Sequence, residues 1–512
     1  MDVWYATMHL MNTQLTILFP ILIPLAGAFF ILLIRSKPKL QSRCTLIVMS
    51  SSLLSSVWLI YQVWSSGDAV VYQLGGWEAP VGISLVGDHL SVFMTFMSQI
   101  VLLSGVIYSL GSKDRSVQYP SFYSIFLTMG VGLTGAILSG DFFNLFVFAE
   151  LLVISGTILT SISDDRLGAE AAYKYFYISL LASAFLLMAI GSLYVSYGTL
   201  NMADLARRIQ ANPNQPLLPV SIALLTATFM IKSAVFPFHF WQPDFHTAAP
   251  TAVSAMLSSV VVKLGVYGFL RMITLLFLEQ ADELRMILMI FGIIGVFFGG
   301  LSAIGTYNAK RMLAYSTLAQ VGFILVGIGW GTPLSITAAL IFTFNHSLIK
   351  AAMLMLAGSV ASRGKVKSAA FNVVMGIGNA MPFAGVLFFI GSLALAGIPP
   401  TNGFISKYYL FKSGLDLRSL FPIILIALGG LFSLIYTVRA FQKIWWKPLP
   451  EGMMLKEKGD QIIAPTLLVL LILFLGFWSE PLVNFSQLTS TWLQDPNNYI
   501  QAVFELVASS VP

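Results

Sequence analysis

The sequence has few charged side chains and almost no cysteine. Charged residues make up 10% of its 512 positions and hydrophobic residues 57%, whereas a soluble domain is about 25% charged. These values exclude a water-soluble enzyme. The single cysteine, Cys44, excludes a disulfide, an iron-sulfur cluster and a thiolate zinc site within this chain. Any redox chemistry would therefore reside elsewhere in an assembly, and we expect neither a cofactor nor a metal here.

The chain instead contains a succession of apolar segments of about 20 residues, the length that an α-helix needs to cross a bilayer. They predict an all-α polytopic membrane protein with about 14 transmembrane helices and no soluble domain. The expected spans are 15–34, 44–64, 89–111, 119–139, 141–162, 170–197, 218–240, 252–273, 282–303, 310–331, 333–361, 380–410, 419–440 and 461–479. The longest connection, 65–88, has β-branched residues around Gly75 and Gly76 and predicts a small extramembrane hairpin.

Basic residues set the expected orientation, because cytoplasmic loops carry an excess of Lys and Arg. Of the 28 in the chain, eighteen fall in loops that follow odd-numbered spans and six on the opposite side. This bias predicts both termini outside, in a bacterial cytoplasmic membrane. The net charge of +6 therefore reports topology and not a nucleic-acid surface.

The amino-terminal segment lacks the basic stretch of a signal peptide, and RSKPKLQSR follows the first apolar run directly. We therefore expect a retained first span. Met8 and Met11 are alternative starts to Met1.

A few ionisable residues are embedded in apolar segments, where they need an explanation. They are Lys232, Lys263, Lys350, Lys407, Glu150 and the central histidine His346, with His239 near a helix break. One charge at the centre of a membrane helix costs about 2.5 to 3.5 kcal/mol, so the four lysines and Glu150 together would cost roughly 12 to 18 kcal/mol if charged and unpaired. Such groups must face a protein interior or a hydrated cavity, pair, or lose their charge. Each option places them on one internal polar path.

A single buried lysine can also be a structural clamp on helix-end carbonyls, or reach the membrane surface. Groups spread over spans 5, 7, 8, 11 and 12 are harder to explain as separate clamps and favour a shared proton path. Lys350 lies one helical turn from His346 and could be only its structural partner. For His239, a capping role and an entrance role are both open.

Prolines are expected to interrupt spans 7 and 12. Pro237 in the first, and Pro399 and Pro400 in the second, remove backbone donors and clash with the preceding turn. Such breaks are tolerated in a bilayer where they line protein or water, and each broken span carries a lysine.

The two breaks lie five spans apart, which predicts two inverted five-helix repeats, as in many membrane transporters. The expected divisions are 1–118 for spans 1 to 3, 119–273 for spans 4 to 8, 282–445 for spans 9 to 13, and 461–512 for span 14 with a C-terminal tail.

The embedded groups suggest a proton relay. A buried lysine can give and take protons near neutral pH, unlike a lysine in water. The hypothesis is a path from Lys232 through Lys263 and His346 to Lys407, with water and Ser, Thr or Asn groups between them. At about 4 Å and an effective dielectric constant of 20, an ion pair is worth about 4 kcal/mol. Glu150 would therefore act as a gating charge that holds a proton on Lys232 when near and releases it when it withdraws.

Five segments together resemble the antiporter-like proton-translocating family shared by Mrp-type cation/proton antiporters and respiratory complex I. They are GDFFNLFVFAELLVISGTIL, IKSAVFPFHFWQPDFHTAAPTAVSAMLSSVVVKLGVYGFLRM, NAKRMLAYSTLAQVGFI, FNHSLIKAAMLMLAGSV and AGIPPTNGFISKYYLF. The resemblance covers most of the chain. It implies that Glu150, Lys232, Lys263, His346 and Lys407 transfer protons, and all five are among the embedded ionisable groups found above.

Within the family, the chain is most similar to the D-type subunits of Mrp antiporters. The setting of Glu150 and the presence of Lys407, where the most similar complex I protein has a glutamate, favour this placement. The resemblance implies a hetero-oligomeric Na⁺/H⁺ antiporter complex with small Mrp-type subunits and a large A-type subunit. Because only one intramembrane carboxylate exists and sodium prefers several oxygen ligands, the cation path is expected in another subunit.

Two alternatives share these residues. The first is a proton-pumping subunit of a redox-driven complex I-like enzyme or membrane hydrogenase. The second is a structural scaffold, which the mid-membrane ionisable groups disfavour.

Overall fold

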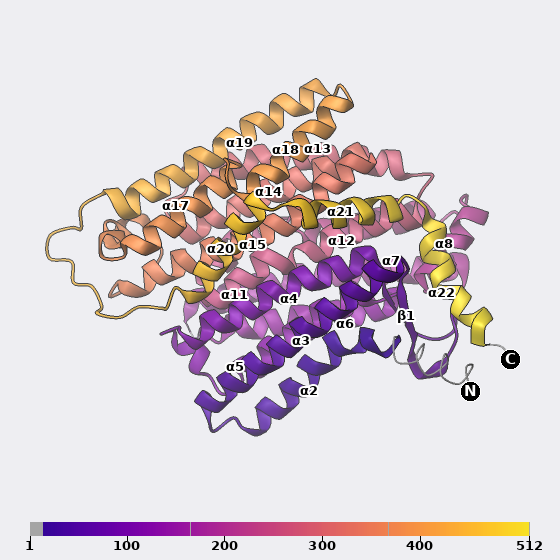
Figure 1. Ribbon diagram of the computed structural model, residues 1–512, viewed down its shortest axis with the longest axis horizontal. Helices are drawn as coiled ribbons and strands as arrows, with labels where there is room; N and C mark the ends of the chain where they lie inside the picture. Colours follow the sequence, from indigo (N-terminus) through magenta and orange to yellow (C-terminus); the bar gives the residue numbers. More distant parts are fainter. Residues whose placement is uncertain (1–13, 164, 367, 511–512) are drawn as a thin grey trace.

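The computed structural model describes residues 14–163, 165–366 and 368–510 (Figure 1), so the candidate starts Met1, Met8 and Met11 lie outside the described residues. Helices form nearly all of it. The first half contains α2 (Phe19–Leu33), α3 (Pro38–Ser66), α4 (His89–Leu110), α5 (Phe122–Leu138), α6 (Phe142–Ser161), α7 (Arg166–Tyr197), α8 (Met202–Ala211), α9 (Leu218–Lys232), α10 (Trp241–Ala248), α11 (Thr251–Met256) and α12 (Lys263–Arg271). The second half contains α13 (Ala281–Gly305), α14 (Ala309–Trp330), α15 (Pro333–Arg363), α16 (Phe371–Val374), α17 (Pro382–Ala396), α18 (Asn402–Asp416), α19 (Leu420–Phe441), α20 (Ile463–Phe477), α21 (Glu480–Trp492) and α22 (Pro496–Ser510).

The helices account for all fourteen expected spans. Within the described residues, ten helices are long and apolar enough to cross a membrane, or eleven if the bent pair α20 and α21 is one span. The shorter apolar helices α5, α9 and α17 occupy the three remaining ranges. The all-α polytopic membrane fold is confirmed. The inverted relation between the two five-helix units, α5 to α12 and α13 to α19, stays a prediction.

The loops gather at two opposite ends of the bundle, as the parity of the basic residues requires. At the basic end, formed by loops after odd-numbered spans, Asp460 accepts a hydrogen bond from the Lys113 backbone at 2.6 Å. At the hairpin end, formed by loops after even-numbered spans, the Gly140 N–H donates to Ser84 at 2.8 Å. In Figure 1 the long loop between α19 and α20 marks the basic end on the left, and β1, α8 and α22 mark the hairpin end on the right.

The connection between α3 and α4 contains an antiparallel pair of strands, β1 (Val70–Gln73) and β2 (Ser84–Gly87), with Val70 opposite Gly87. β2 leads into α4. Asp88 and Ser91 form a reciprocal capping box at the start of this helix. Gln14 and α22 both lie near this hairpin. Both ends of the described chain are thus on the same side of the bundle, and the side of the membrane stays a prediction.

α15 is the central helix of the molecule. Its most apolar stretch is entirely buried, and it packs against α4, α11, α14, α17, α18, α20 and α21. A capping box of Thr332 and Ser335 begins it at the hairpin end. Because α15 carries His346 and Lys350, these groups lie in the protein interior and face no lipid.

The breaks expected from proline are present, and a third one occurs near the C-terminus. α9 and α10 flank Pro237, and α17 and α18 flank Pro399 and Pro400. Span 14 is expected from the sequence to end at 479, with 480–512 as a tail, whereas the structure bends by 77° there and continues as α21 and α22. Gly476 at this bend fits closely against the second break, since a Cβ there would lie 2.0 Å from the Pro400 carbonyl oxygen.

Candidate functional site

The first break leaves Lys232 at the end of α9, in a setting without a fixed partner. Its Nζ is buried and has no hydrogen-bond partner among the described residues. A cavity of about 20 Å³ adjoins the side chain, room for one water molecule. The residues that line this cavity come from α6, α7, α9, α10 and the stretch around Lys263: Leu152, Val153, Tyr175, Ser179, Ile231, Lys232, Trp241, Val261 and Leu264.

Glu150 on α6 is the acidic group that interacts electrostatically with this lysine. Its side chain is half-buried, and it accepts a hydrogen bond from the hydroxyl of Ser183 on α7. The carboxylate is close enough to Lys232 for an electrostatic interaction, but the described part of the chain shows no ion pair between them. The arrangement therefore places a negative charge beside Lys232 without fixing the ammonium to it.

Lys263 and His346 are in direct contact at the centre of the bundle. Lys263 Nζ lies 2.9 Å from Nδ1 of His346 and donates to the Ser258 carbonyl at 3.3 Å. A π-helical turn, Leu257–Val261, precedes α12, and such turns often occur at functional positions. Nε2 of His346 is buried and has no partner among the described residues. This second ring nitrogen is therefore available to a further proton donor or acceptor.

Lys350, one turn after His346, points to α14. Its Nζ donates to the Leu313 carbonyl at 2.6 Å and to Ser316 Oγ at 2.8 Å. Ser316 also accepts from the hydroxyl of Tyr436 at 2.8 Å. The bonds of Lys350 thus go to α14 and not to His346, and whether this lysine is structural or functional stays open.

The second break places Lys407 under the end of the preceding half-helix. Lys407 Nζ donates to the carbonyls of Leu395 at 3.1 Å and Ala396 at 2.7 Å, the last residues of α17. It also lies 5.2 Å from the centre of the Phe323 ring. Gly397 turns the chain here with a φ of +80°, and a Cβ at this position would lie 2.4 Å from Cδ of Lys407.

A pair of asparagines connects the centre to the second break. Asn345, next to His346, donates to the Asn402 carbonyl and to Ser406 Oγ, both at 2.9 Å. Asn402 in turn donates to the side-chain oxygen of Asn345 at 2.9 Å. These amides join α15 to the half-helix that carries Lys407. The sequence predicts Asn groups in the path but does not single out these two.

The remaining predicted group, His239, lies apart from this network. It sits in the first break, with its ring centroid 4.6 Å from that of Phe298 on α13. Its Nδ1 has no hydrogen-bond partner among the described residues. The capping role and the entrance role both stay open.

Two further buried groups were not selected from the sequence. His246 on α10 is completely buried, with Nδ1 3.1 Å from Ser254 Oγ and Nε2 unpartnered among the described residues. It falls between two expected spans and therefore looked like a loop residue. Arg271 forms a buried ion pair with Asp88 at 2.5 Å that ties α12 to the start of α4. Within the described residues, no group of three or more His, Cys, Asp or Glu side chains could hold a metal.

Sequence relatives include proteins from two kinds of complex. The D subunit of the Na(+)/H(+) antiporter of Alkalihalophilus pseudofirmus is 31% identical over 495 residues, which cover 96% of this chain and 99% of the relative. The corresponding protein of Bacillus subtilis has the same identity and coverage. The N subunit of the NADH-quinone oxidoreductase of Desulforudis audaxviator is 31% identical over 444 residues, 85% of this chain and 87% of that one.

Solved structures and a family model match the same group of proteins. A chain of the Mrp complex from Dietzia sp. DQ12-45-1b shares the fold, with a TM-score of 0.88 at 24% identity, over 96% of this chain and 99% of that one. A chain of the membrane-bound sulfane sulfur reductase, an archaeal respiratory membrane complex, has a TM-score of 0.88 at 30% identity, over 96% and 100%. The model of the NADH:quinone oxidoreductase/Mrp antiporter transmembrane family matches residues 139–433. With more than half of its length in that match, the chain belongs to the NADH:quinone oxidoreductase/Mrp antiporter transmembrane family.

Proposed function

We propose that this chain is the proton-translocating subunit of a multisubunit Na⁺/H⁺ antiporter, a component of a secondary transporter and not an enzyme. The observation that carries the proposal is the 2.9 Å contact between Lys263 Nζ and Nδ1 of His346 at the buried centre. Two ionisable groups that share a hydrogen bond can pass a proton between them. The D subunits of Na(+)/H(+) antiporters among the relatives support cation/proton exchange as the use of that path.

The first half of the proposed path runs from Lys232 to Lys263. Lys232 holds a proton while the carboxylate of Glu150 is near and releases it when that carboxylate withdraws. The small cavity beside Lys232 reaches Val261 and Leu264, the neighbours of Lys263. One water in this cavity would shorten the gap between the two lysines.

The second half runs from His346 to Lys407. Asn345 and Asn402 hold α15 and α18 in register through reciprocal hydrogen bonds. They orient the path, because an amide side chain does not exchange protons as readily as an imidazole. Lys407 is the terminal group, with Lys350 and His239 as accessory candidates.

The partners follow from the same family. The proposed assembly contains small Mrp-type membrane subunits and a large A-type subunit in a bacterial cytoplasmic membrane, with both termini of this chain outside. Glu150 is the one carboxylate expected in mid-span, and a single carboxylate is a poor sodium site. We therefore assign the proton to this chain and the sodium ion to another subunit.

The test is sodium-driven proton flux in everted vesicles that contain the intact complex and a pH-sensitive dye. Lys263→Met should lower the flux roughly 100-fold or more, the usual contribution of a positioned acid or base. Lys458→Met, on an exposed loop residue at the basic end, is the matched control and should retain the flux. Normal flux in a Lys263→Met complex that purifies with all its subunits would overturn the relay.

A redox-driven proton pump is the second candidate. The observation that favours it is the equal identity, 31%, to the N subunit of an NADH-quinone oxidoreductase, together with 30% to a chain of an archaeal respiratory complex. Gentle purification from the native membrane and mass spectrometry of the associated proteins separate the two candidates. Flavin or iron-sulfur proteins would establish the pump, and small Mrp-type subunits without them would establish the antiporter.

A further inference from the structure

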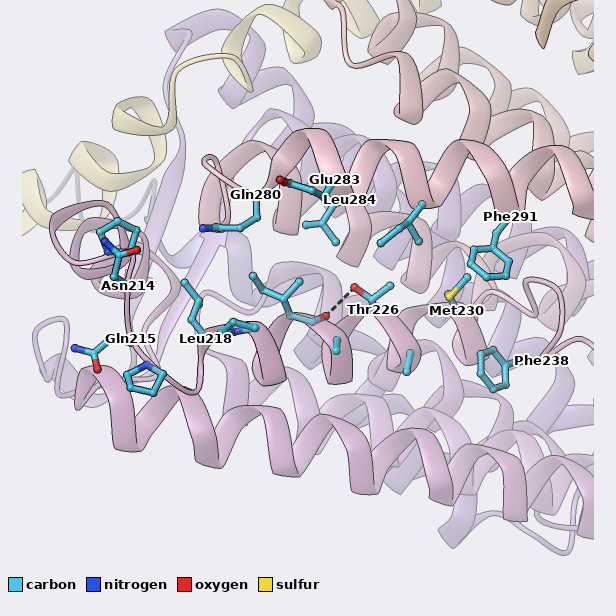
Figure 2. Close-up of a pocket in the computed structure, with 17 residues that line it drawn as sticks. Asn214, Gln215, Leu218, Thr226, Met230, Phe238, Gln280, Glu283, Leu284 and Phe291 are labelled. Atoms are coloured by element: carbon cyan, nitrogen blue, oxygen red, sulfur yellow. Dashed lines mark hydrogen bonds between the residues drawn. The ribbon is translucent and has the colours of Figure 1, made fainter. Parts of the chain in front are cut away.

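A groove of about 720 Å³ runs between α9 and α13, on the outer side of the bundle and apart from the contact between Lys263 and His346 (Figure 2). These two helices belong to different five-helix units. Most of the groove wall is hydrocarbon from Leu218, Ile222 and Met230 on one side and Leu284, Ile287 and Phe291 on the other. The hydroxyl of Thr226, midway along, is already satisfied because it donates to the Ile222 carbonyl at 2.7 Å (dashed in Figure 2).

One end of the groove is polar and carries a negative charge. Figure 2 shows Asn214, Gln215, Gln280 and Glu283 at the hairpin end, opposite Met230 and Phe238 at the inner end. Glu283 is exposed and has no ion-pair partner among the described residues, and the buried Oε1 of Gln280 has no hydrogen-bond donor there either. None of the described lining residues is Lys or Arg. The polar end therefore offers acceptors and one negative charge, which suit a cationic donor.

The length and the volume of the groove suit one lipid chain. From Leu218 to Met230 the wall of α9 is about 18 Å long, close to the roughly 15 Å depth of one leaflet of a bilayer. The groove volume of about 720 Å³ lies within the range of about 300 to 1,000 Å³ that is typical of small-molecule sites.

We propose that this groove binds one phospholipid from the leaflet at the hairpin end, with an acyl chain between α9 and α13 and an amine-bearing headgroup held by Glu283 and Gln280. The acyl chain ends against Met230 and Phe238. These residues flank the first break, two positions before Lys232 and one before His239. The bound lipid thus closes the side of the break to the bilayer and joins the two five-helix units.

The test uses the intact complex in vesicles of phosphatidylethanolamine and phosphatidylglycerol at 3:1, with a trace of phosphatidylethanolamine that carries a diazirine on one acyl chain. After illumination, labelled peptides are mapped by mass spectrometry. Labelling of residues 218–238 and 281–291 should exceed labelling of the exposed face of α19 at least fivefold. Equal labelling of all bilayer-facing helices would reduce the groove to ordinary lipid contact and overturn the proposal. A partner helix found cross-linked in the groove, with no lipid label, would do the same.

Two pairs of variants test the binding of the acyl chain and of the headgroup separately. Ala223→Phe fills the groove and should reduce its labelling about tenfold, whereas Ala427→Phe, on an exposed alanine of α19, should leave it unchanged. Glu283→Gln should remove the preference for the phosphatidylethanolamine probe over a phosphatidylglycerol probe with the same diazirine, and Glu279→Gln should keep it. A preference that survives Glu283→Gln would overturn the assignment of the headgroup. The wild-type map decides the main question even if Ala223→Phe fails to assemble.

Discussion

The two broken helices hold their lysines in opposite ways. At the first break, Lys232 ends its half-helix beside a small cavity, with an Nζ that is unpaired among the described residues. At the second, Lys407 Nζ donates to the carbonyls of Leu395 and Ala396. Both side chains belong to the half-helix nearer the hairpin end, so their position along the bundle does not explain the difference. The difference lies in the backbone carbonyls that the opposite half-helix presents to the lysine.

The end of α17 offers free carbonyls, which carry the negative end of the helix dipole. These groups stabilise the ammonium form of Lys407 without any acidic residue. Lys232 lies at the end of its own half-helix, but its Nζ donates to no carbonyl among the described residues, and the acidic group beside it, Glu150, is bound to Ser183 and not to the lysine. The same sequence signal, a proline break with a lysine, thus gives one lysine bonded to helix-end carbonyls and one lysine without a hydrogen-bond partner among the described residues.

The largest effect is expected at Lys232. Lys232→Ala should abolish sodium-driven proton flux, roughly 100-fold or more. Lys232→Arg should be equally inactive, because an arginine keeps the positive charge but does not release its proton in a protein. Flux is measured by dye fluorescence in everted vesicles, with Lys458→Ala as the control. An active Lys232→Arg would mean that a fixed charge suffices there.

At the second break, a change of the charged group should lower the proton flux less than at the first. Lys407→Arg keeps donors for the two carbonyls, so thermal stability should stay within about 1 kcal/mol, the scale of one hydrogen bond. Flux should fall at least about tenfold, because the proton is no longer released. Full flux in Lys407→Arg would make this lysine a structural clamp, and Lys407→Met would then reveal the clamp through a loss of stability.

The sequence could predict the breaks and the buried groups, because both depend on local chemistry. Pro237 and Pro399 interrupt helices wherever they occur, and an ionisable residue in an apolar span stands out without any structure. Of the five predicted relay residues, three are buried and two, Glu150 and Lys232, are half-buried. Lys263 and His346 are in contact. The long apolar helices follow equally from local hydrophobicity.

The sequence could not predict the partners, because those depend on packing between distant segments. Nothing local shows that Lys407 reaches the end of α17 or that Lys350 reaches Ser316. His246 was missed because a histidine between two prolines looks like part of a loop, although α10 folds back into the core. The bend before α21 has no such local signal, since Trp478 and Ser479 are not helix breakers of the strength of proline.

A smaller change tests whether the position of Lys407 matters. Gly397→Ala adds a Cβ 2.4 Å from Cδ of Lys407 at a φ of +80°, so the side chain must leave its carbonyls. Gly452→Ala has the same kind of strain, at a φ of +76°, with no atom within 4 Å of the new Cβ. Both should lose about 1 to 2 kcal/mol of stability from left-handed backbone, but only Gly397→Ala should lower the flux, several-fold. Equal flux in the two variants would show that the carbonyl contact is dispensable.

The smallest expected effect lies at the first break, where Ala234 occupies the left-handed region with a φ of +53°. Ala234→Gly relieves about 1 to 2 kcal/mol of strain. It also loses a buried methyl group, worth about 0.8 kcal/mol, and gains flexibility in the unfolded chain, worth about 0.4 to 1 kcal/mol. The expected net change in unfolding free energy is therefore close to zero, measured by reversible unfolding in mixed micelles. Ala189→Gly, equally buried but inside α7, has no strain to relieve and should lose about 1.5 to 2 kcal/mol. A loss of that size in Ala234→Gly would mean that the backbone of the first break stores no strain.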